Sequence, residues 1–176
     1  MSNETYPENS ETRTATDKQV PAPYSYIETQ PSLDKMVGRL RGARRVALDI
    51  EANSLYRYHI RVCLIQLSFL GGNYIVDPLA KLDFSDFVET LADKPLIAHG
   101  ADYDLRMMRT SLGFHPRREV FDTMLAAKIL GIEQIGLVAL AGQLLGVALN
   151  KMGSGPGAYL HDGYYFDYYL RRRKRG

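Results

Sequence analysis

The chain has 176 residues, the size of one domain or of one domain with a tail. Hydrophobic residues make up 45% and charged residues 24%, which excludes a wholly disordered chain and a collagen-like one. No apolar run approaches the roughly 18 residues of a membrane-spanning helix, and the polar N-terminus has no secretory signal, so we expect no membrane partner. The single cysteine, Cys63, excludes an intrachain disulfide and predicts a cytoplasmic protein.

The formal net charge of +2 is unevenly distributed. Five of the 22 basic residues form the run Arg171-Arg172-Arg173-Lys174-Arg175, and the remaining 17 are outnumbered by the 20 acidic residues, which leaves −3 for the rest of the chain. A basic nucleic-acid-binding module usually spreads its charge over a face or a helix. An acidic body instead suits a protein that collects carboxylates around a metal ion. The terminal run is either a phosphate contact or a solvated end.

The hydrophobic pattern predicts three parts. Residues 1–25 are polar and without period, which predicts a flexible leader, and residues 26–151 form the candidate domain. Residues 152–176 combine a Gly and Pro cluster, five tyrosines between 159 and 169 and the basic end, and predict a poorly ordered tail. The helices and strands expected in the domain are, in chain order, a helix at 31–40, strands at 46–51, 62–70 and 74–76 with a hairpin turn at 71–73, a helix at 84–91 with Asp83 as its N-cap, a strand at 95–98, a helix at 105–112, a strand at 120–121, a helix at 123–130 capped by Asp122-Thr123, and a helix at 137–145.

Strands that alternate with helices after an initial hairpin favour an α/β domain with a mixed central sheet flanked by helices. Within it, Asp49 and Glu51 lie two residues apart on a predicted strand, so both carboxylates emerge on the same face. Two acids on one face of a core strand repel each other unless a positive charge lies between them. The pair therefore indicates either a bound divalent cation or a structural arrangement in which one acid caps a turn and the other pairs with an arginine.

A second acidic pair, Asp102 and Asp104, follows the predicted strand at 95–98. A carboxylate in the first turn of a helix is favoured by the helix dipole, so this pair alone indicates no more than helix capping. Asp102 precedes the apolar helical spacing and is the expected cap. Asp104 can point toward the end of the strand that carries Asp49 and Glu51, if the two elements adjoin.

Taken together, these segments resemble the DEDD superfamily of 3′–5′ exonucleases and, within it, ribonuclease D. Residues 47–52 are similar to the first motif of the superfamily, and residues 99–105 to the second, which places the third acid of the family at Asp104. The resemblance covers about residues 25–151. Further ribonuclease D-like segments follow in the family's order at 64–67, 75–78, 120–123 and 144–151.

The resemblance implies a ribonuclease H-like fold and hydrolysis of RNA phosphodiester bonds from the 3′ end, with transfer-RNA 3′-end processing as the usual task of the family. It implies two divalent metal ions, Mg²⁺ or Mn²⁺, and assigns Asp49, Glu51 and Asp104 as catalytic residues and metal ligands. Tyr103 and His99, beside the second motif, are the implied substrate contacts. The implied partner is RNA with a free 3′ end, and no protein partner is implied.

One part of the family pattern is missing. The third motif, Tyr-x-x-x-Asp or His-x-x-x-x-Asp, is not intact: Gly163 lies four residues before Asp167, and His161 lies six residues before it. Asp167 is a candidate surrogate ligand. If Asp167 does not replace the missing ligand, we expect the fold to be truncated at its C-terminal helices. The residues after Lys151 would then be the product of a frameshift, a splice or a truncation. We therefore expect a weakened second metal site and activity lower by orders of magnitude.

Two alternatives stay open. A DNA-directed proofreading-type exonuclease keeps the chemistry and changes the substrate. A nuclease-derived nucleic-acid-binding module that no longer cleaves is favoured by the missing motif, whereas the three well-placed acids argue against it.

Overall fold

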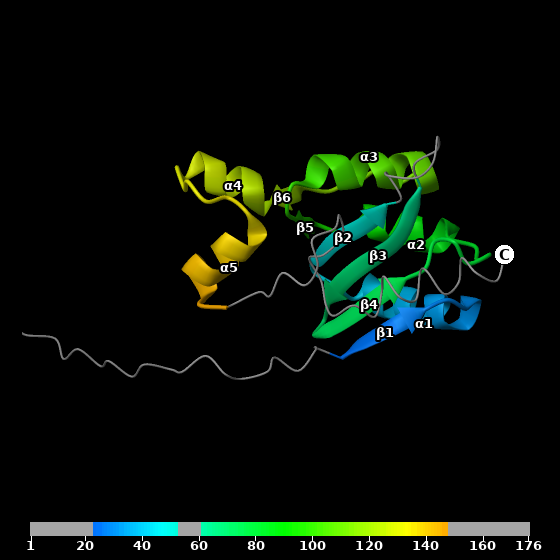
Figure 1. The fold of residues 1–176 in the computed structure, drawn as a ribbon. Helices are drawn as coiled ribbons and strands as arrows, with labels where there is room; N and C mark the ends of the chain where they lie inside the picture. Colours follow the sequence, from blue (N-terminus) through cyan, green and yellow to red (C-terminus); the bar gives the residue numbers. More distant parts are fainter. Residues whose placement is uncertain (1–22, 53–60, 148–176) are drawn as a thin grey trace, which may run out of the picture.

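The computed structural model describes residues 23–52 and 61–147. Within these ranges one six-stranded sheet has the order β1-β4-β3-β2-β5-β6 (Figure 1). The central strands β4, β3 and β2 are antiparallel, whereas β1 pairs with β4, β5 with β2 and β6 with β5 in parallel. The predicted α/β domain with a mixed sheet flanked by helices is confirmed. The elements are β1 (Tyr24–Ile27), α1 (Gln30–Arg41), β2 (Val46–Ala52), β3 (Val62–Phe69), β4 (Gly72–Val76), α2 (Ser85–Ala92), β5 (Leu96–Ala98), α3 (Ala101–Leu112), β6 (Val120–Asp122), α4 (Thr123–Ile129) and α5 (Leu137–Leu145).

Strand β2 lies inside the sheet and presents different chemistry on its two faces. Val46, Leu48 and Ile50 are buried, and they belong to the main apolar core. Because side chains alternate along a strand, Asp49 and Glu51 emerge on the opposite face, where both are half-buried. The apolar face of β2 therefore anchors the strand, and the other face is left for polar chemistry.

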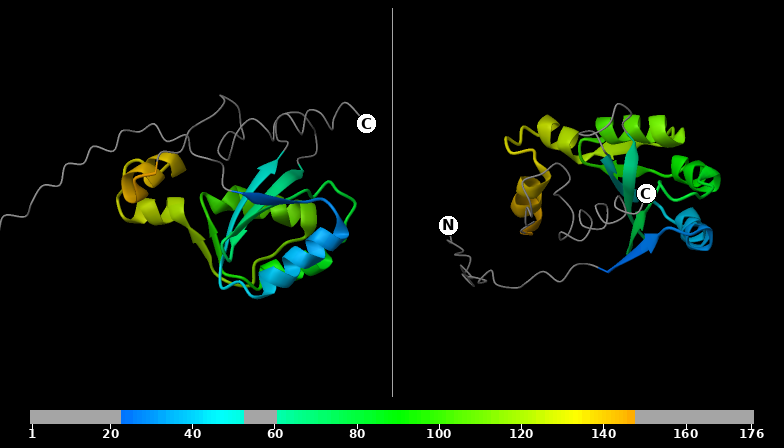
Figure 2. Two further views of the ribbon diagram at one scale, coloured as in Figure 1. Left: turned by 90° about the horizontal axis from the view of Figure 1, so that it is seen from below. Right: turned by 45° about the vertical axis from the view of Figure 1, so that its right-hand side comes forward.

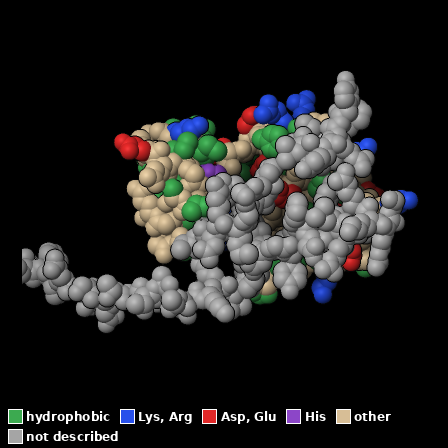
Figure 3. All heavy atoms as spheres, viewed as in Figure 1, with side chains coloured by type: hydrophobic (Ala, Val, Ile, Leu, Met, Phe, Trp, Pro, Cys, Tyr) green, Lys and Arg blue, Asp and Glu red, His purple; other side chains and the backbone are tan. Residues whose placement is uncertain are grey.

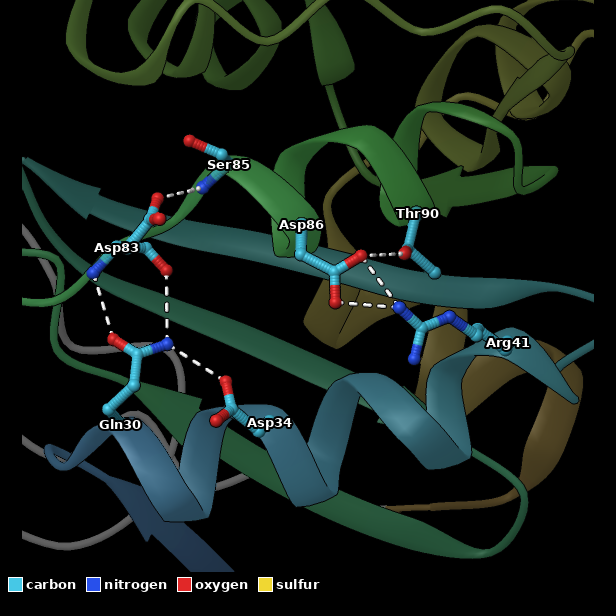
Figure 4. Close-up of polar contacts among 7 residues, drawn as sticks. All are labelled: Gln30, Asp34, Arg41, Asp83, Ser85, Asp86 and Thr90. Carbon is cyan, nitrogen blue, oxygen red and sulfur yellow. Dashed lines mark hydrogen bonds and ion pairs between the residues drawn. The ribbon is translucent and has the colours of Figure 1, made fainter.

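Helices α1 and α2 lie side by side, and polar contacts along their length join them (Figure 4). Nη2 of Arg41 donates to both carboxylate oxygens of Asp86, at 2.7 and 2.6 Å. At the other end, Gln30 donates from Nε2 to the Asp83 carbonyl and accepts from the Asp83 amide. These groups are exposed, so they contribute little to stability and mainly fix how the two helices align. Burial of the apolar α1 face, Leu33, Met36, Val37 and Leu40, supplies most of the stabilisation.

Two predicted details differ in the structure. The β3–β4 hairpin turn is Leu70-Gly71, one residue earlier than predicted, and both residues have positive φ, 47° and 69°. Positive φ at both residues is the geometry of a two-residue hairpin turn. The right-handed twist of the flanking strands favours this turn over one centred on Gly72. The N-cap of α2 is Phe84 rather than Asp83, although the Asp83 carboxylate still accepts the Ser85 amide at 2.9 Å.

Helices α4 and α5 lie beyond β6, away from α1 and α2 (Figures 1 and 2). Asp122 caps α4 as predicted, because its side chain accepts the amides of Met124 and Leu125. Among the described helices, none is long and apolar enough to cross a membrane. Several large apolar side chains of this pair are more than half exposed: Leu125, Ile129, Leu130, Leu144 and Leu145.

The junction between β5 and α3 depends on a glycine. Gly100 is the N-cap of α3 and has a φ of 75°, in the left-handed region. A Cβ on Gly100 would meet Cε of Met124 at 2.5 Å, so the α3 and α4 junctions approach each other closely here. The backbone conformation selects glycine, whereas the flexible end of Met124 could move aside for a Cβ.

We expect Gly100→Ala to lower the free energy of unfolding by about 1–2 kcal/mol or more, because alanine is strained at this φ and Met124 has to move. Gly38→Ala is the control, since Gly38 lies inside α1 and a Cβ there would have no atom within 4 Å. That change should raise the free energy of unfolding by roughly 0.5–1 kcal/mol. Urea unfolding at equilibrium measures both, and equal effects at the two positions would contradict this account.

Candidate active site

The two acids of β2 stand on the half-buried face of the strand. Asp49 is opposite Gln66 of β3, and Glu51 is opposite Leu64. The β2–β3 register shifts between Glu51 and Ala52, so the pairing becomes irregular directly after the second acid. The pattern Asp-Ile-Glu thus places two carboxylates on one face of a central strand, as its spacing predicts.

The third acid comes from α3. Asp104 is only 8% exposed, which is unusual for a carboxylate in the first turn of a helix. Asp102, expected as the cap, is instead the second residue of the helix. Its carboxylate faces solvent and pairs with Arg106 at 2.7 Å. The helix begins earlier than expected because Gly100 takes the N-cap position, and this rotates Asp104, not Asp102, toward the protein interior.

Burial, and for two of the three also the charge of neighbouring acids, raises the pKa of these carboxyl groups. Burial raises the pKa of Asp49, against the opposing effects of the Ile50 backbone and His99. Burial and then the Asp49 charge raise the pKa of Glu51 to about 7. For Asp104, burial and then the charges of Asp49, Glu51 and Asp122 raise the pKa to about 7. The three acids, which we call the β2–α3 acidic cluster, therefore form one electrostatically coupled group.

Within the described ranges, no lysine or arginine forms an ion pair with a member of the β2–α3 acidic cluster. Figure 3 shows acidic side chains in the middle of one face, with basic side chains along the rim over α3. An all-oxygen donor set of this kind fits a hard divalent cation. The described residues nevertheless contain no group of three or more His, Cys, Asp or Glu already arranged to hold a metal ion.

The two predicted substrate contacts lie on either side of the α3 start. Tyr103 is 40% exposed on the helix, next to Asp104. His99 is half-buried directly after β5, and its Nδ1 lies 2.9 Å from the Thr123 hydroxyl. Asp167, the candidate surrogate, falls outside the described residues and stays a prediction.

Asp122 has a role that the sequence analysis missed. It was assigned only to α4, but its carboxylate also accepts the amides of Gly100 and Ala101 at the start of α3, both at 2.9 Å. The only signal in the sequence is the start of α3 at Gly100-Ala101, where glycine offers no capping side chain. A partner 21 residues away could not be identified from that.

The raised pKa values predict how stability depends on pH. In the folded protein Glu51 and Asp104 hold their protons to about pH 7, whereas in the unfolded chain they release them near 4. Stability contributed by these groups is present at low pH and is lost as the pH rises toward and through 7. In metal-free protein, Asp104→Asn should therefore raise the thermal midpoint relative to wild type by clearly more at pH 8 than at pH 5. Asp102→Asn, on the exposed side of the same helix, should track wild type, and parallel pH profiles for all three proteins would contradict the coupling.

Comparisons with known proteins agree with this geometry. The family model described as 3′–5′ exonuclease matches residues 24–154. Exosome complex component 10 of Rattus norvegicus is 32% identical over 142 residues, which are 74% of this chain and 16% of that protein. The chain spans 14% to 21% of the length of the plant and fly relatives that it matches.

Two solved structures share the fold. The catalytic core of RRP6 from Trypanosoma brucei has a TM-score of 0.70 at 24% identity, and the alignment covers 80% of this chain and 39% of that one. Escherichia coli RNase D, described as an exoribonuclease involved in structured RNA processing, has a TM-score of 0.69 at 23% identity, covering 87% and 44%. The predicted ribonuclease D-like domain of ribonuclease H-like fold is therefore confirmed, and the chain belongs to the 3′–5′ exonuclease family.

Proposed function

We propose that this domain removes nucleotides from the 3′ end of RNA, and that Asp49, Glu51 and Asp104 are its catalytic residues and the ligands of a divalent cation, Mg²⁺ or Mn²⁺. The observation that carries the proposal is the β2–α3 acidic cluster: one buried and two half-buried carboxyl groups from two elements, all with raised pKa values and coupled through the charge of Asp49. RNA as substrate is supported by the names of the similar proteins. The Trypanosoma brucei RNase D, for example, was solved in complex with RNA U12.

A divalent cation held by Asp49, Glu51 and Asp104 would activate a water for attack on phosphate near neutral pH, and it would offset the negative charge that develops there. The residues of this chain have to be ionised to hold it. Because the pKa values of Glu51 and Asp104 are about 7 without a cation, binding releases protons and strengthens as the pH rises. Without a preformed ligand set among the described residues, the three side chains would have to move toward the cation as it binds.

Tyr103 and His99 are proposed to contact the terminal nucleotide. The exposed ring of Tyr103 lies beside Asp104 in sequence and on the same helix, where it can stack on a base without selecting its identity. A structured RNA with a single-stranded 3′ end, such as a transfer-RNA precursor, is the proposed substrate class, in keeping with the ribonuclease D likeness. The cytoplasmic location stays a prediction.

A second candidate function is nucleic-acid binding without cleavage. The observation that favours it is the lack, within the described ranges, of a ready-made group of three metal-ligating side chains. The third motif of the family, on which activity also depends, is not intact in this sequence, and its candidate surrogate, Asp167, falls outside the described residues. A DNA substrate is the remaining alternative and differs from RNA only in the 2′-hydroxyl that the site has to accommodate.

The proposal is tested with a 5′-labelled single-stranded RNA and its DNA counterpart, incubated with Mg²⁺ or Mn²⁺ and resolved on a denaturing gel. We expect stepwise shortening of the RNA from its 3′ end. Because each acid is required, Asp104→Asn should lower the rate by at least about 100-fold, which corresponds to about 2.7 kcal/mol at 1.36 kcal/mol per tenfold change. Asp102→Asn, with the same chemical change on the exposed side of α3, should keep the wild-type rate.

Fluorescence anisotropy of the same RNA separates the candidates. Tight binding by a folded wild-type protein that leaves the RNA intact would support the binding module and overturn the nuclease. Faster shortening of the DNA than of the RNA would overturn the choice of substrate. Cleavage that persists in Asp49→Asn and Asp104→Asn would show that the β2–α3 acidic cluster is not the active site.

A further inference from the structure

The carboxyl ends of β5 and β6 lie side by side, and a single carboxylate joins the helices that follow them. Ala98 of β5 is paired with Asp122 of β6 in a parallel ladder. Oδ1 of Asp122 accepts the amides of Gly100, Met124 and Leu125, and Oδ2 accepts the amide of Ala101, at 2.9 to 3.2 Å. Asp122 therefore caps the first turn of α3 and the first turn of α4 at the same time.

Helix α3 depends on this borrowed cap. Its own N-cap, Gly100, has no side chain, so the first amides of the helix would otherwise lack a protein partner. Burial raises the pKa of Asp122, but the four backbone amides outweigh it and hold that pKa below the ordinary value. The carboxylate is therefore charged at neutral pH, and its hydrogen bonds are of the strong, charge-assisted kind.

A second contact ties the same two junctions together. The Thr123 hydroxyl donates to the Ala98 carbonyl at 3.1 Å. Because a hydroxyl has one proton, it must accept in its 2.9 Å contact with His99, so Nδ1 of His99 carries the ring proton. The orientation of His99 is thus set by the residue after Asp122. The whole start of α3 is fixed to the start of α4.

The fixed start of α3 matters because Asp104 lies in the first turn of this helix and is only 8% exposed. Its carboxylate keeps this buried position only while the start of the helix keeps its place. At the far end of the helix, the Ser111 hydroxyl accepts the Val62 amide of β3 at 3.2 Å. Along the helix, Asp104 lies between the Asp122 cap and the Ser111–Val62 hydrogen bond, and it is nearer to the Asp122 cap.

We propose that Asp122 is a positioning residue for the cation site: by capping α3 from the neighbouring strand, it holds the Asp104 carboxylate against Asp49 and Glu51. The inference rests on the proposed function, because it assigns Asp122 to the same cluster. Asp122 is not itself a ligand, since its oxygens already accept four amides. Groups that orient metal ligands in this way typically change metal affinity by about 10- to 100-fold when they are removed.

Two substitutions separate positioning from general stability. In Asp122→Ser, the shorter side chain remains a good N-cap for α4 but has only one acceptor oxygen and cannot also serve α3. In Asp122→Asn, the amide oxygen can keep the three bonds of Oδ1, and only the bond to Ala101 is lost. We expect Asp122→Ser to lower the affinity for Mn²⁺, measured by electron paramagnetic resonance of the free ion, by at least about tenfold. Asp122→Asn, which loses only the bond to Ala101, should lower it by about two- to threefold, and Asp102→Asn should leave it unchanged.

Amide hydrogen exchange in metal-free protein supplies the second readout. In Asp122→Ser, the first-turn amides of α3 should exchange faster while the amides of β2 and β3 keep their protection. Wild-type Mn²⁺ affinity in a folded Asp122→Ser protein would overturn the inference and leave the proposed function standing. If Asp122→Ser does not fold, wild-type affinity and wild-type α3 exchange in Asp122→Asn would overturn it. If wild type binds Mn²⁺ no more tightly than Asp49→Asn, the proposed cation site is overturned, and this inference is overturned with it.

Discussion

Electrostatic repulsion among three carboxylates, one buried and two half-buried, is the constraint on which the rest of this structure depends. Burial raises the pKa values of Asp49, Glu51 and Asp104, neighbouring charge raises those of Glu51 and Asp104 further, and no described lysine or arginine is paired with them. Folding tolerates the arrangement because the opposite face of β2 packs into an apolar core. The energy that this core supplies by burial offsets the unfavourable charges. A site of this kind is poised to gain stability from a cation.

The sheet topology is what brings the two halves of the site together. Strand β2 lies between the antiparallel β3 and the parallel β5, so the helix that follows β5 starts beside the strand that carries the acidic pair. The chain crosses from β5 to α3 at Gly100, whose left-handed backbone allows the sharp change of direction. The Asp122 carboxylate then joins the β5–α3 connection to the β6–α4 connection by hydrogen bonds. The same few residues thus set both the fold at this edge and the position of Asp104.

Most elements of the domain could be predicted from sequence because their signals are local. Period-two alternation marks β2, apolar helical spacing marks α1 and α3, and Asp122-Thr123 marks the start of α4. Strand β1 was missed because Tyr24–Ile27 is short and is defined by its pairing with β4, about 50 residues away. The hairpin turn was misplaced by one residue because Gly71 and Gly72 both allow positive φ. The family resemblance singled out Asp49, Glu51 and Asp104, and their role as ligands stays a prediction. The sequence misassigned Asp102 as the cap and could not reveal the bond from Asp122 to α3. Both depend on tertiary contacts.

The central claim, that three acids form one coupled cation site, is tested most directly by carbon-13 nuclear magnetic resonance of the side-chain carboxyl groups as the pH is varied. The account predicts that Glu51 and Asp104 titrate near pH 7 in metal-free protein. It also predicts that saturating Mg²⁺ moves both titrations below their ordinary range, because the cation favours the ionised form. Titration of both groups near pH 4 without metal, or midpoints that Mg²⁺ does not move, would contradict it.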